Sequence, residues 1–329
     1  MREGGRVRHR GLLAAGAIAA GAVGAVALGR NRERAWQGEA DPTGGDVLSL
    51  PEGRSTTVTT DDGAVLAVTD AGSGPLVVLA HCYTGRRGSW APVARRLVAS
   101  GHRVVLWDQR GHGESTVGSD GLSIDRLGDD LRDVLEAIDA SDAVVAGHSM
   151  GGMTIMACVG RHRDVIAART QALVLVATAA TGIAHVPRTE GLGAALMRSA
   201  LATAVTAGPL GPFVVRGTEG RRPVWAHLEA SARMYAETPP ETRAAMVRSM
   251  ATMDLRAGLA GCPVPVVVIV GTQDRLTRKG YGAQIVSCLP DAELVVLPHA
   301  GHMLPFEEPD LLSDIIAARA VAPVATARP

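Results

Sequence analysis

The chain has 329 residues, with 33 basic and 33 acidic side chains and a formal net charge of zero. This length suffices for one large domain with a sizeable hydrophobic core, together with a tail and an insertion. The balanced charge and the lack of a basic stripe in the body of the chain argue against nucleic acid as a partner. The four cysteines are Cys82, Cys158, Cys262 and Cys288. They include no C-x-x-C pair, which argues against a zinc site.

An uncharged segment near the N-terminus, residues 11–29, is rich in Ala, Gly, Val, Leu and Ile and has arginines on both sides. As a helix that rises ~1.5 Å per residue it would span roughly 28 Å, close to the thickness of a bilayer core. We therefore predict that residues 1–35 form an N-terminal membrane anchor or signal segment and that residues 11–29 bind the membrane.

Two alternatives to the anchor stay open. The first is secretion after cleavage near Ala27, because Ala25-Val26-Ala27 has the small-x-small pattern of a cleavage site. In an exported protein, Cys262 and Cys288 would be candidates for a disulfide bridge; otherwise we expect buried free thiols. The second alternative is a mobile Ala/Gly tail on a cytosolic protein.

Residues 36–54 are rich in Gly, Pro, Asp and Glu, which predicts a linker. A domain is expected over 55–320 and a tail over 321–329. Two short runs around Asp61-Asp62-Gly63 predict a hairpin, and further apolar runs predict buried strands at 76–80, 104–107, 143–146, 173–177, 264–270 and 293–297. Helical patterns lie between or after these strands, at 89–99, 122–138, 150 onwards, 279–288 and 307–318. This alternation predicts an α/β domain with a mostly parallel sheet, helices on both faces and an antiparallel edge.

One long segment breaks the alternation. Residues 178–261 contain no run that predicts a strand, but they have helix-like runs at 192–207 and 240–253, with prolines and glycines between them. We predict a helical insertion at about 181–260 that covers the edge of the sheet as a lid. Ordinary core helices are the alternative interpretation.

The sequence Val144-Val145-Ala146-Gly147-His148-Ser149-Met150-Gly151-Gly152 has the strand-turn-helix context of a nucleophile elbow. Glycines on either side of the serine allow the strand end and the helix start to approach closely. We expect Ser149 Oγ to point out of the sheet edge and the N–H of Met150 to face a developing oxyanion.

A serine nucleophile needs a base. His302 lies in a loop directly after the last predicted strand, where open α/β sheets build their sites; His299 is the local alternative. The orienting acid should lie between serine and histidine in the chain. Asp274 follows a strongly apolar strand and meets this condition better than Asp254, which lies in the insertion.

Four motifs occur together in one order. They are His81-Cys82-Tyr83-Thr84-Gly85, the turn from Asp108 to Ser115, the Gly-His-Ser-Met-Gly elbow, and the Gly-Thr-Gln-Asp and Gly-His-Met pair near the end. In these motifs the chain from about residue 56 to 318 resembles the α/β-hydrolase fold enzymes. The resemblance implies that Tyr83 donates a second oxyanion N–H, although this chain has Cys82 where the family usually has glycine. It also implies structural roles for the Asp108 turn and for His81, His112 and His148.

The resemblance implies a serine hydrolase that needs no metal and no organic cofactor. The candidate catalytic residues are Ser149, Asp274 and His302, with Tyr83 and Met150 at the oxyanion. We expect hydrolysis of carboxyl esters of small lipophilic substrates through an acyl-enzyme. Lactone, thioester or C–C bond hydrolysis, cofactor-free perhydrolysis, and a non-catalytic small-molecule-binding protein are the alternatives. A serine at the elbow argues against haloalkane dehalogenase and epoxide hydrolase chemistry, which use a carboxylate nucleophile.

Overall fold

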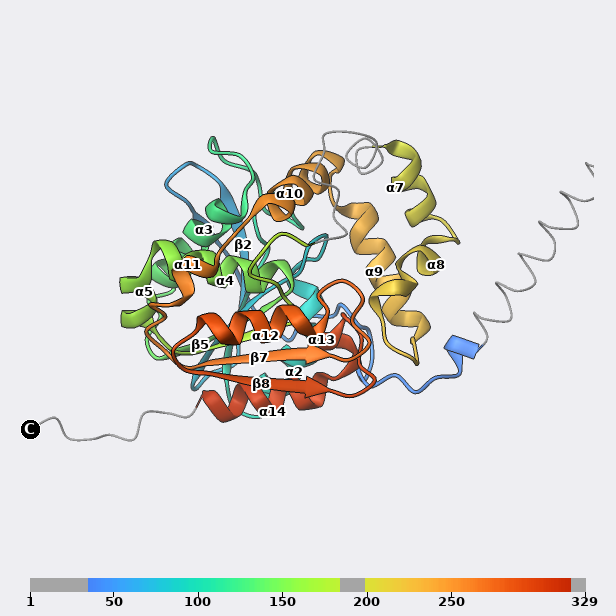
Figure 1. The fold of residues 1–329 in the computed structure, drawn as a ribbon. Coiled ribbons are helices and arrows are strands. Elements are labelled where there is room, and N and C mark those ends of the chain that lie inside the picture. The colour runs from blue at the N-terminus through green and yellow to red at the C-terminus, as the bar shows by residue number, and fades with distance from the viewer. Residues whose placement is uncertain (1–34, 184–198, 321–329) are drawn as a thin grey trace, which may run out of the picture.

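The computed structural model describes residues 35–183 and 199–320. Its centre is an eight-stranded sheet in the order β1-β2-β4-β3-β5-β6-β7-β8 (Figure 1). The antiparallel edge is formed by β1 (Gly53–Thr59) and β2 (Val65–Ala71), and β2 also pairs antiparallel with β4 (Arg103–Trp107). The other pairs are parallel, and they involve β3 (Leu76–Ala80), β5 (Ala143–His148), β6 (Thr170–Val176), β7 (Val266–Gly271) and β8 (Ala292–Leu297). The predicted α/β sheet with its antiparallel edge is confirmed.

Both faces of the inner strands β3, β5 and β7 are buried, which explains the uninterrupted apolar runs of these strands. Alternate residues face opposite sides: Val78 and Val145 belong to one core cluster, and Val77 and Val144 belong to the other. The first cluster also contains side chains of α3 (Ile124–Ala137), α4 (Met150–Arg161), α5 (Arg163–Arg169) and α12 (Lys279–Cys288). The second contains side chains of α2 (Ala91–Ala99), α13 (Leu304–Glu307) and α14 (Pro309–Arg319). Helices therefore cover both faces, as Figure 1 shows.

Between β6 and β7 the described residues are mainly helical. The elements are α7 (Ala200–Ala207), α8 (Gly211–Val215), the 3-10 helix η2 (Arg216–Thr218), α9 (Trp225–Glu237), α10 (Pro240–Thr252) and α11 (Arg256–Leu259). In Figure 1, α7, α8 and α9 lie together on the side of the molecule towards which the β7 and β8 arrows point. We call residues 199–260 the helical segment. Part of the helix-like run at 192–207 lies outside the described residues, and the role of a lid stays a prediction.

The segment predicted as a linker is packed against the domain. Thr43 and Val47 are buried. Arg95 and Arg96 of α2 donate hydrogen bonds to main-chain carbonyl groups of Pro42, Thr43, Asp46 and Ser49. These bonds fix the segment across α2, so residues 39–50 form a strap rather than a free linker.

The predicted membrane localisation is corrected. Across residues 35–183 and 199–320, no helix combines the length and apolar character needed to cross a bilayer. The proposed anchor at 11–29, the cleavage position near Ala27 and the tail at 321–329 lie outside the described residues. We withdraw the prediction of membrane attachment, because no described helix supports it. All four cysteines are free, so no Cys262–Cys288 bridge forms.

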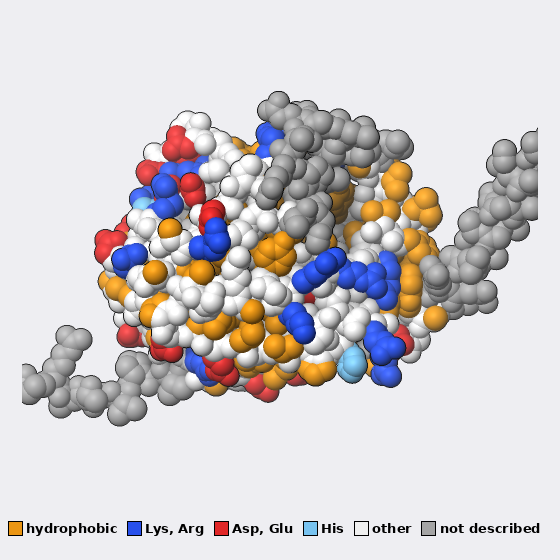
Figure 2. Space-filling view, viewed as in Figure 1, with side chains coloured by type: hydrophobic (Ala, Val, Ile, Leu, Met, Phe, Trp, Pro, Cys, Tyr) orange, Lys and Arg blue, Asp and Glu red, His pale blue; other side chains and the backbone are white. Residues whose placement is uncertain are grey.

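On the surface, acidic and basic side chains are interspersed over much of the face shown in Figure 2. Apolar side chains lie between them, and on this face the described residues show no continuous basic stripe. The distribution agrees with the zero net charge of the chain.

Candidate active site

Ser149 occupies the sharp turn between β5 and α4, with φ 52° and ψ −112°. A positive φ at a residue other than glycine costs about 1–3 kcal/mol and persists only where the surroundings hold it. Here the Ser149 N–H donates to the Val176 carbonyl at 2.8 Å, and the Thr178 hydroxyl donates to the Ser149 carbonyl at 2.7 Å. The structure therefore contains the strained turn that the sequence predicts.

The two glycines that flank this turn have no space for a side chain. A Cβ on Gly147 would lie 2.4 Å from the Gly151 carbonyl oxygen, and a Cβ on Gly151 would lie 2.1 Å from the Ala80 carbonyl oxygen. The second contact places the start of α4 against the end of β3. This brings the elbow next to the loop that contains Tyr83.

Asp274 and His302, the proposed acid and base, are hydrogen-bonded. The distance from His302 Nδ1 to Asp274 Oδ2 is 2.8 Å, and both residues are 5% exposed. Asp274 follows β7 and His302 follows β8, so both lie at the carboxyl edge of the sheet. With Nδ1 donating to the carboxylate, Nε2 is free to accept a proton.

Three further donors surround the Asp274 carboxylate. The N–H groups of Leu276 and Thr277 donate to Oδ1 at 2.7 and 2.8 Å, and the Thr277 hydroxyl donates to Oδ2 at 2.6 Å. Burial alone would raise the pKa of Asp274, but the interactions with His302 and Thr277 outweigh burial and hold the pKa below its ordinary value. The carboxylate is therefore ionised and able to orient the imidazole. Sequence reasoning missed Thr277, although an Asp followed three residues later by Thr is a turn pattern that suggests this bond.

His148 links the loop of His302 to the elbow. Its Nε2 donates to the His302 carbonyl oxygen at 2.7 Å, and the two ring centroids are 5.0 Å apart. Burial lowers the pKa of His148 to about 3, so the ring is neutral at pH 7. Because His148 immediately precedes Ser149, this bond ties the main chain of His302 to the residue before the candidate nucleophile.

The candidate oxyanion donors are the N–H groups of Tyr83 and Met150. Among the described residues, neither N–H has an acceptor in the hydrogen-bond network. Met150 is the first residue of α4, where the helix dipole favours negative charge. The Tyr83 hydroxyl donates to the Arg243 carbonyl in α10 at 3.1 Å, which ties the Tyr83 loop to the helical segment.

Cys82, the departure from the usual family pattern, has its side chain in an apolar cluster. The buried members of this cluster are Val47, Cys82, Ala230, Met234, Met303 and Phe306. Burial raises the pKa of the thiol to about 12, so it is protonated and a poor nucleophile at pH 7. Its thiol therefore packs between the strap, α9 and the loop of His302.

Hydrogen bonds from neighbouring residues shape the same loop. His81 Nδ1 donates to the Cys82 carbonyl oxygen at 2.8 Å, and His81 Nε2 accepts the Gln109 N–H at 2.9 Å. Burial lowers the pKa of His81 to about 4, so it is a neutral structural residue. Asp108 accepts N–H groups of Arg87 and Glu114 at 2.6 and 3.0 Å, which supports a structural turn. The sequence analysis did not predict the hydrogen bond between Gln109 and His81.

Within the described residues, neither alternative side chain is hydrogen-bonded to Ser149, Asp274 or His302. His299 is exposed. Asp254 pairs with Arg256 at 2.6 Å, and both side chains are about half exposed. Among the described residues, no group of three or more His, Cys, Asp or Glu side chains is arranged to hold a metal ion.

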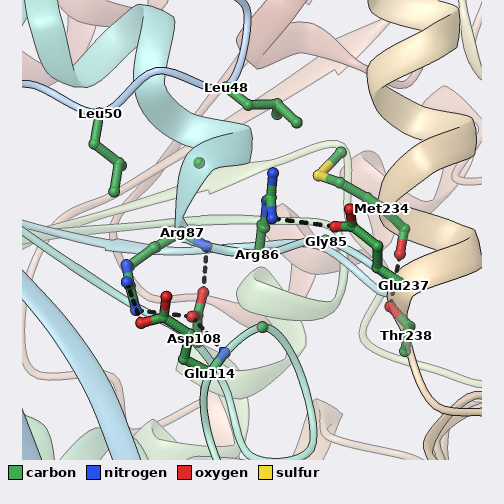
Figure 3. Close-up of a pocket in the computed structure, with 12 residues that line it drawn as sticks. Leu48, Leu50, Gly85, Arg86, Arg87, Asp108, Glu114, Met234, Glu237 and Thr238 are labelled. Carbon is green, nitrogen blue, oxygen red and sulfur yellow. Dashed lines mark hydrogen bonds and ion pairs between the residues drawn. The ribbon is translucent and has the colours of Figure 1, made fainter.

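A cavity of about 440 Å³ lies between the strap, the Tyr83 loop and α9 (Figure 3). Its walls include Leu48, Leu50, Gly85, Arg86, Met234 and Glu237. Arg86 pairs with Glu237 at 3.1 Å, and Arg87 pairs with Asp108 and Glu114 at 2.9 and 2.6 Å. None of the candidate catalytic residues lines this cavity, so we treat it as separate from the proposed site.

Comparisons with known proteins agree with this architecture. Residues 75–309 match the family described as "alpha/beta hydrolase fold". The chain is 28% identical to 3-oxoadipate enol-lactonase 1 of Acinetobacter baylyi, with 82% of this chain and 97% of that protein aligned. It is 38% identical to the non-heme chloroperoxidase CPO-A1 of Kitasatospora aureofaciens, but that match spans only 32% of this chain and 38% of the relative. The structure of a thermophilic esterase from Thermogutta terrifontis superimposes with a TM-score of 0.66 at 26% identity, covering 80% of this chain and 97% of that one.

Proposed function

Because the chain belongs to the α/β-hydrolase fold family, we propose that it is a serine hydrolase that cleaves carboxyl esters of small lipophilic substrates. One observation carries the proposal: the His148–His302 hydrogen bond joins the strained Ser149 turn to the buried Asp274–His302 pair. In this proposal Ser149 acts as the nucleophile, His302 as the base and Asp274 as the orienting acid, all at one sheet edge.

The mechanism begins with proton transfer from Ser149 Oγ to His302 Nε2 as the oxygen attacks the ester carbonyl carbon. The N–H groups of Tyr83 and Met150 stabilise the oxyanion of the tetrahedral intermediate. His302 then protonates the leaving alkoxide, and an acyl-enzyme remains on Ser149. Water attacks the acyl group and gives a proton to His302, which passes it to Ser149 Oγ as the bond to the acyl carbon breaks and the carboxylic acid is released. Asp274 stabilises the imidazolium in both halves of the cycle.

The proposal of a lipophilic substrate draws on the apolar core against which Tyr83 packs. Met150 of α4 and Met246 and Met250 of α10 belong to one buried cluster, against which Tyr83 packs. Methionine side chains adapt to irregular apolar shapes, which suits a site that accepts several acyl or alcohol groups.

Lactone hydrolysis is the second candidate function. It is favoured by the alignment with an enol-lactonase along 97% of that protein. A lactone is a cyclic ester, so the same residues would open it and the leaving alcohol would stay attached to the acyl group.

The test is a comparison of two substrate panels with the same enzyme. p-Nitrophenyl esters of graded acyl length form one panel and lactones of graded ring size form the other. We expect the highest kcat/KM with short or medium esters, and we expect Ser149→Ala to lower kcat by at least about 10³-fold while the protein stays folded. Hydrolysis confined to lactones would replace the ester proposal, and full activity of Ser149→Ala would refute the serine mechanism.

A further inference from the structure

The main chain of His302 is held from two sides. Its carbonyl oxygen accepts the His148 Nε2–H at 2.7 Å. Its N–H donates to the Thr218 carbonyl at 2.7 Å, and the Met303 N–H shares this acceptor at 3.2 Å. Thr218 ends η2. The helical segment therefore makes a direct hydrogen bond to the residue proposed as the base.

Glu307 adds a second connection between the same two parts of the chain. One oxygen of its carboxyl group accepts the Gly301 N–H at 2.8 Å and the Gly220 N–H at 2.9 Å. Gly301 precedes His302, and Gly220 lies two residues after Thr218. A single carboxyl oxygen therefore fastens the His302 loop to the turn formed by residues 218–220.

The two segments approach too closely for side chains. A Cβ on Gly220 would lie 2.3 Å from the His299 carbonyl oxygen, and a Cβ on Gly301 would lie 2.3 Å from the Gly220 nitrogen. Gly217, three residues before Gly220, has no atom within 4 Å of its Cβ position. The requirement for glycine is thus specific to the point of contact.

From these contacts we infer that Glu307 is a positioning residue through which the turn 218–220 sets the place of His302. The inference rests on the proposed function, in which His302 Nε2 must lie within about 2.6–3.2 Å of the Ser149 hydroxyl. A displacement of about 1 Å at such a distance can cost on the order of 100-fold in rate. The helical segment then controls the position of the imidazole.

Gly220→Ala tests the inference from the side of the helical segment. The added methyl group must push the turn away from the His302 loop, so we expect kcat to fall about 10-fold or more while KM stays within about threefold. The rate of Ser149 labelling by a fluorophosphonate should fall in parallel, since the reaction needs the same base. Gly217→Ala is the matched control and should keep the wild-type kcat, KM and labelling rate.

Two substitutions of Glu307, to glutamine and to alanine, test the inference from the side of the His302 loop. Glutamine retains an oxygen that can accept both N–H groups, so Glu307→Gln should keep kcat within about threefold of the wild type. Glu307→Ala removes the acceptor, so its kcat and labelling rate should fall as much as those of Gly220→Ala. Glu308→Ala is the control, because the neighbouring Glu308 carboxylate accepts no hydrogen bond within the part of the chain that the structure describes.

Thermal unfolding shows which variants are folded, and Gly220→Ala decides the question if Glu307→Ala does not fold. Wild-type kcat in Gly220→Ala, or an equal loss in Glu307→Gln and Glu307→Ala, would overturn the inference. A rise in KM at unchanged kcat in Gly220→Ala or Glu307→Ala would also overturn the inference. Failure of the proposed function has a different signature, because the wild type itself would then neither hydrolyse esters nor label at Ser149, and the inference would fall with it.

Discussion

Glu219 has an almost completely buried carboxyl group, with 2% of the residue exposed. One oxygen accepts the Val224 N–H at 3.2 Å. The other has no hydrogen-bond partner among the described residues and lies 3.6 Å from His227 Nδ1. Burial, and after it the nearby Glu307 carboxyl, raises the pKa of Glu219 well above its ordinary value.

This raised pKa predicts a pH-dependent effect of Glu219→Gln on stability. In the unfolded chain the carboxyl ionises near its ordinary pKa of 4.5, whereas the folded protein keeps the proton to higher pH. The stability that the proton contributes is complete below about pH 4.5 and is lost as pH rises towards the folded-state pKa. Glutamine keeps an acceptor for Val224 and cannot ionise. The free energy of unfolding of the variant, relative to wild type, should therefore increase as pH rises above about 4.5.

Urea unfolding at several pH values measures this difference. Glu229→Gln, on the exposed side of α9, is the control and should show a difference that is small at each pH. A difference for Glu219→Gln that stays constant over the same range would contradict the assigned burial of charge.

At the residue scale, the sequence predicts those site residues that belong to a motif or that follow the expected order of serine, acid and histidine along the chain. Ser149 has the glycines of its turn on either side, and Asp274 and His302 each follow a strand in the expected order; the structure places the last two 2.8 Å apart. Their catalytic roles stay predictions. The roles of Thr277, Gln109 and Glu307 were not predicted, because each depends on hydrogen bonds across loops whose conformation no periodicity defines.

Among the elements, α3 and α4 pack closely at a glycine. A Cβ on Gly128 would lie 2.8 Å from the Cys158 nitrogen and 2.9 Å from the Ala157 side chain. Contact with a neighbouring helix backbone leaves little freedom for relaxation. This contact fixes α3 against the helix that begins at the elbow.

Gly128→Ala should therefore destabilise the protein by about 1–3 kcal/mol through overpacking. Alanine gains up to about 1 kcal/mol in helix propensity over glycine, which offsets only part of the loss. Gly280→Ala is the matched control in α12, since its Cβ position has no neighbour within 4 Å. It should be neutral or stabilising in denaturant unfolding, and equal stabilisation by both substitutions would refute close packing at Gly128.

The strands and long helices could be predicted because their apolar pattern is continuous. The runs at 76–80 and 104–107 coincide with β3 and most of β4, and the helix expected over 122–138 contains α3. Short elements were missed: α8, α11 and α13 have four or five residues each, too few to show a helical period. The helix expected at 307–318 instead begins after α13, at Pro309.

At the scale of the whole molecule, the predicted α/β-hydrolase fold is confirmed by the sheet order and the family match. The strap at 39–50 was mistaken for a linker, because its partners Arg95 and Arg96 lie some fifty residues away along the chain. The Gly, Pro, Asp and Glu content of a segment indicates how flexible that segment would be in isolation. Whether the segment packs on the domain depends on residues that are distant in the sequence. The membrane prediction was wrong because it rested on the length and polarity of residues 11–29 alone.

The central claim for the molecule is that Ser149 is a nucleophile activated by His302. Mass spectrometry of peptides after fluorophosphonate treatment tests it most directly. We expect one adduct per chain, on the peptide that contains Ser149, absent in Ser149→Ala and formed at least about 100-fold more slowly in His302→Ala. An adduct on another residue, or an unchanged labelling rate in His302→Ala, would contradict the claim.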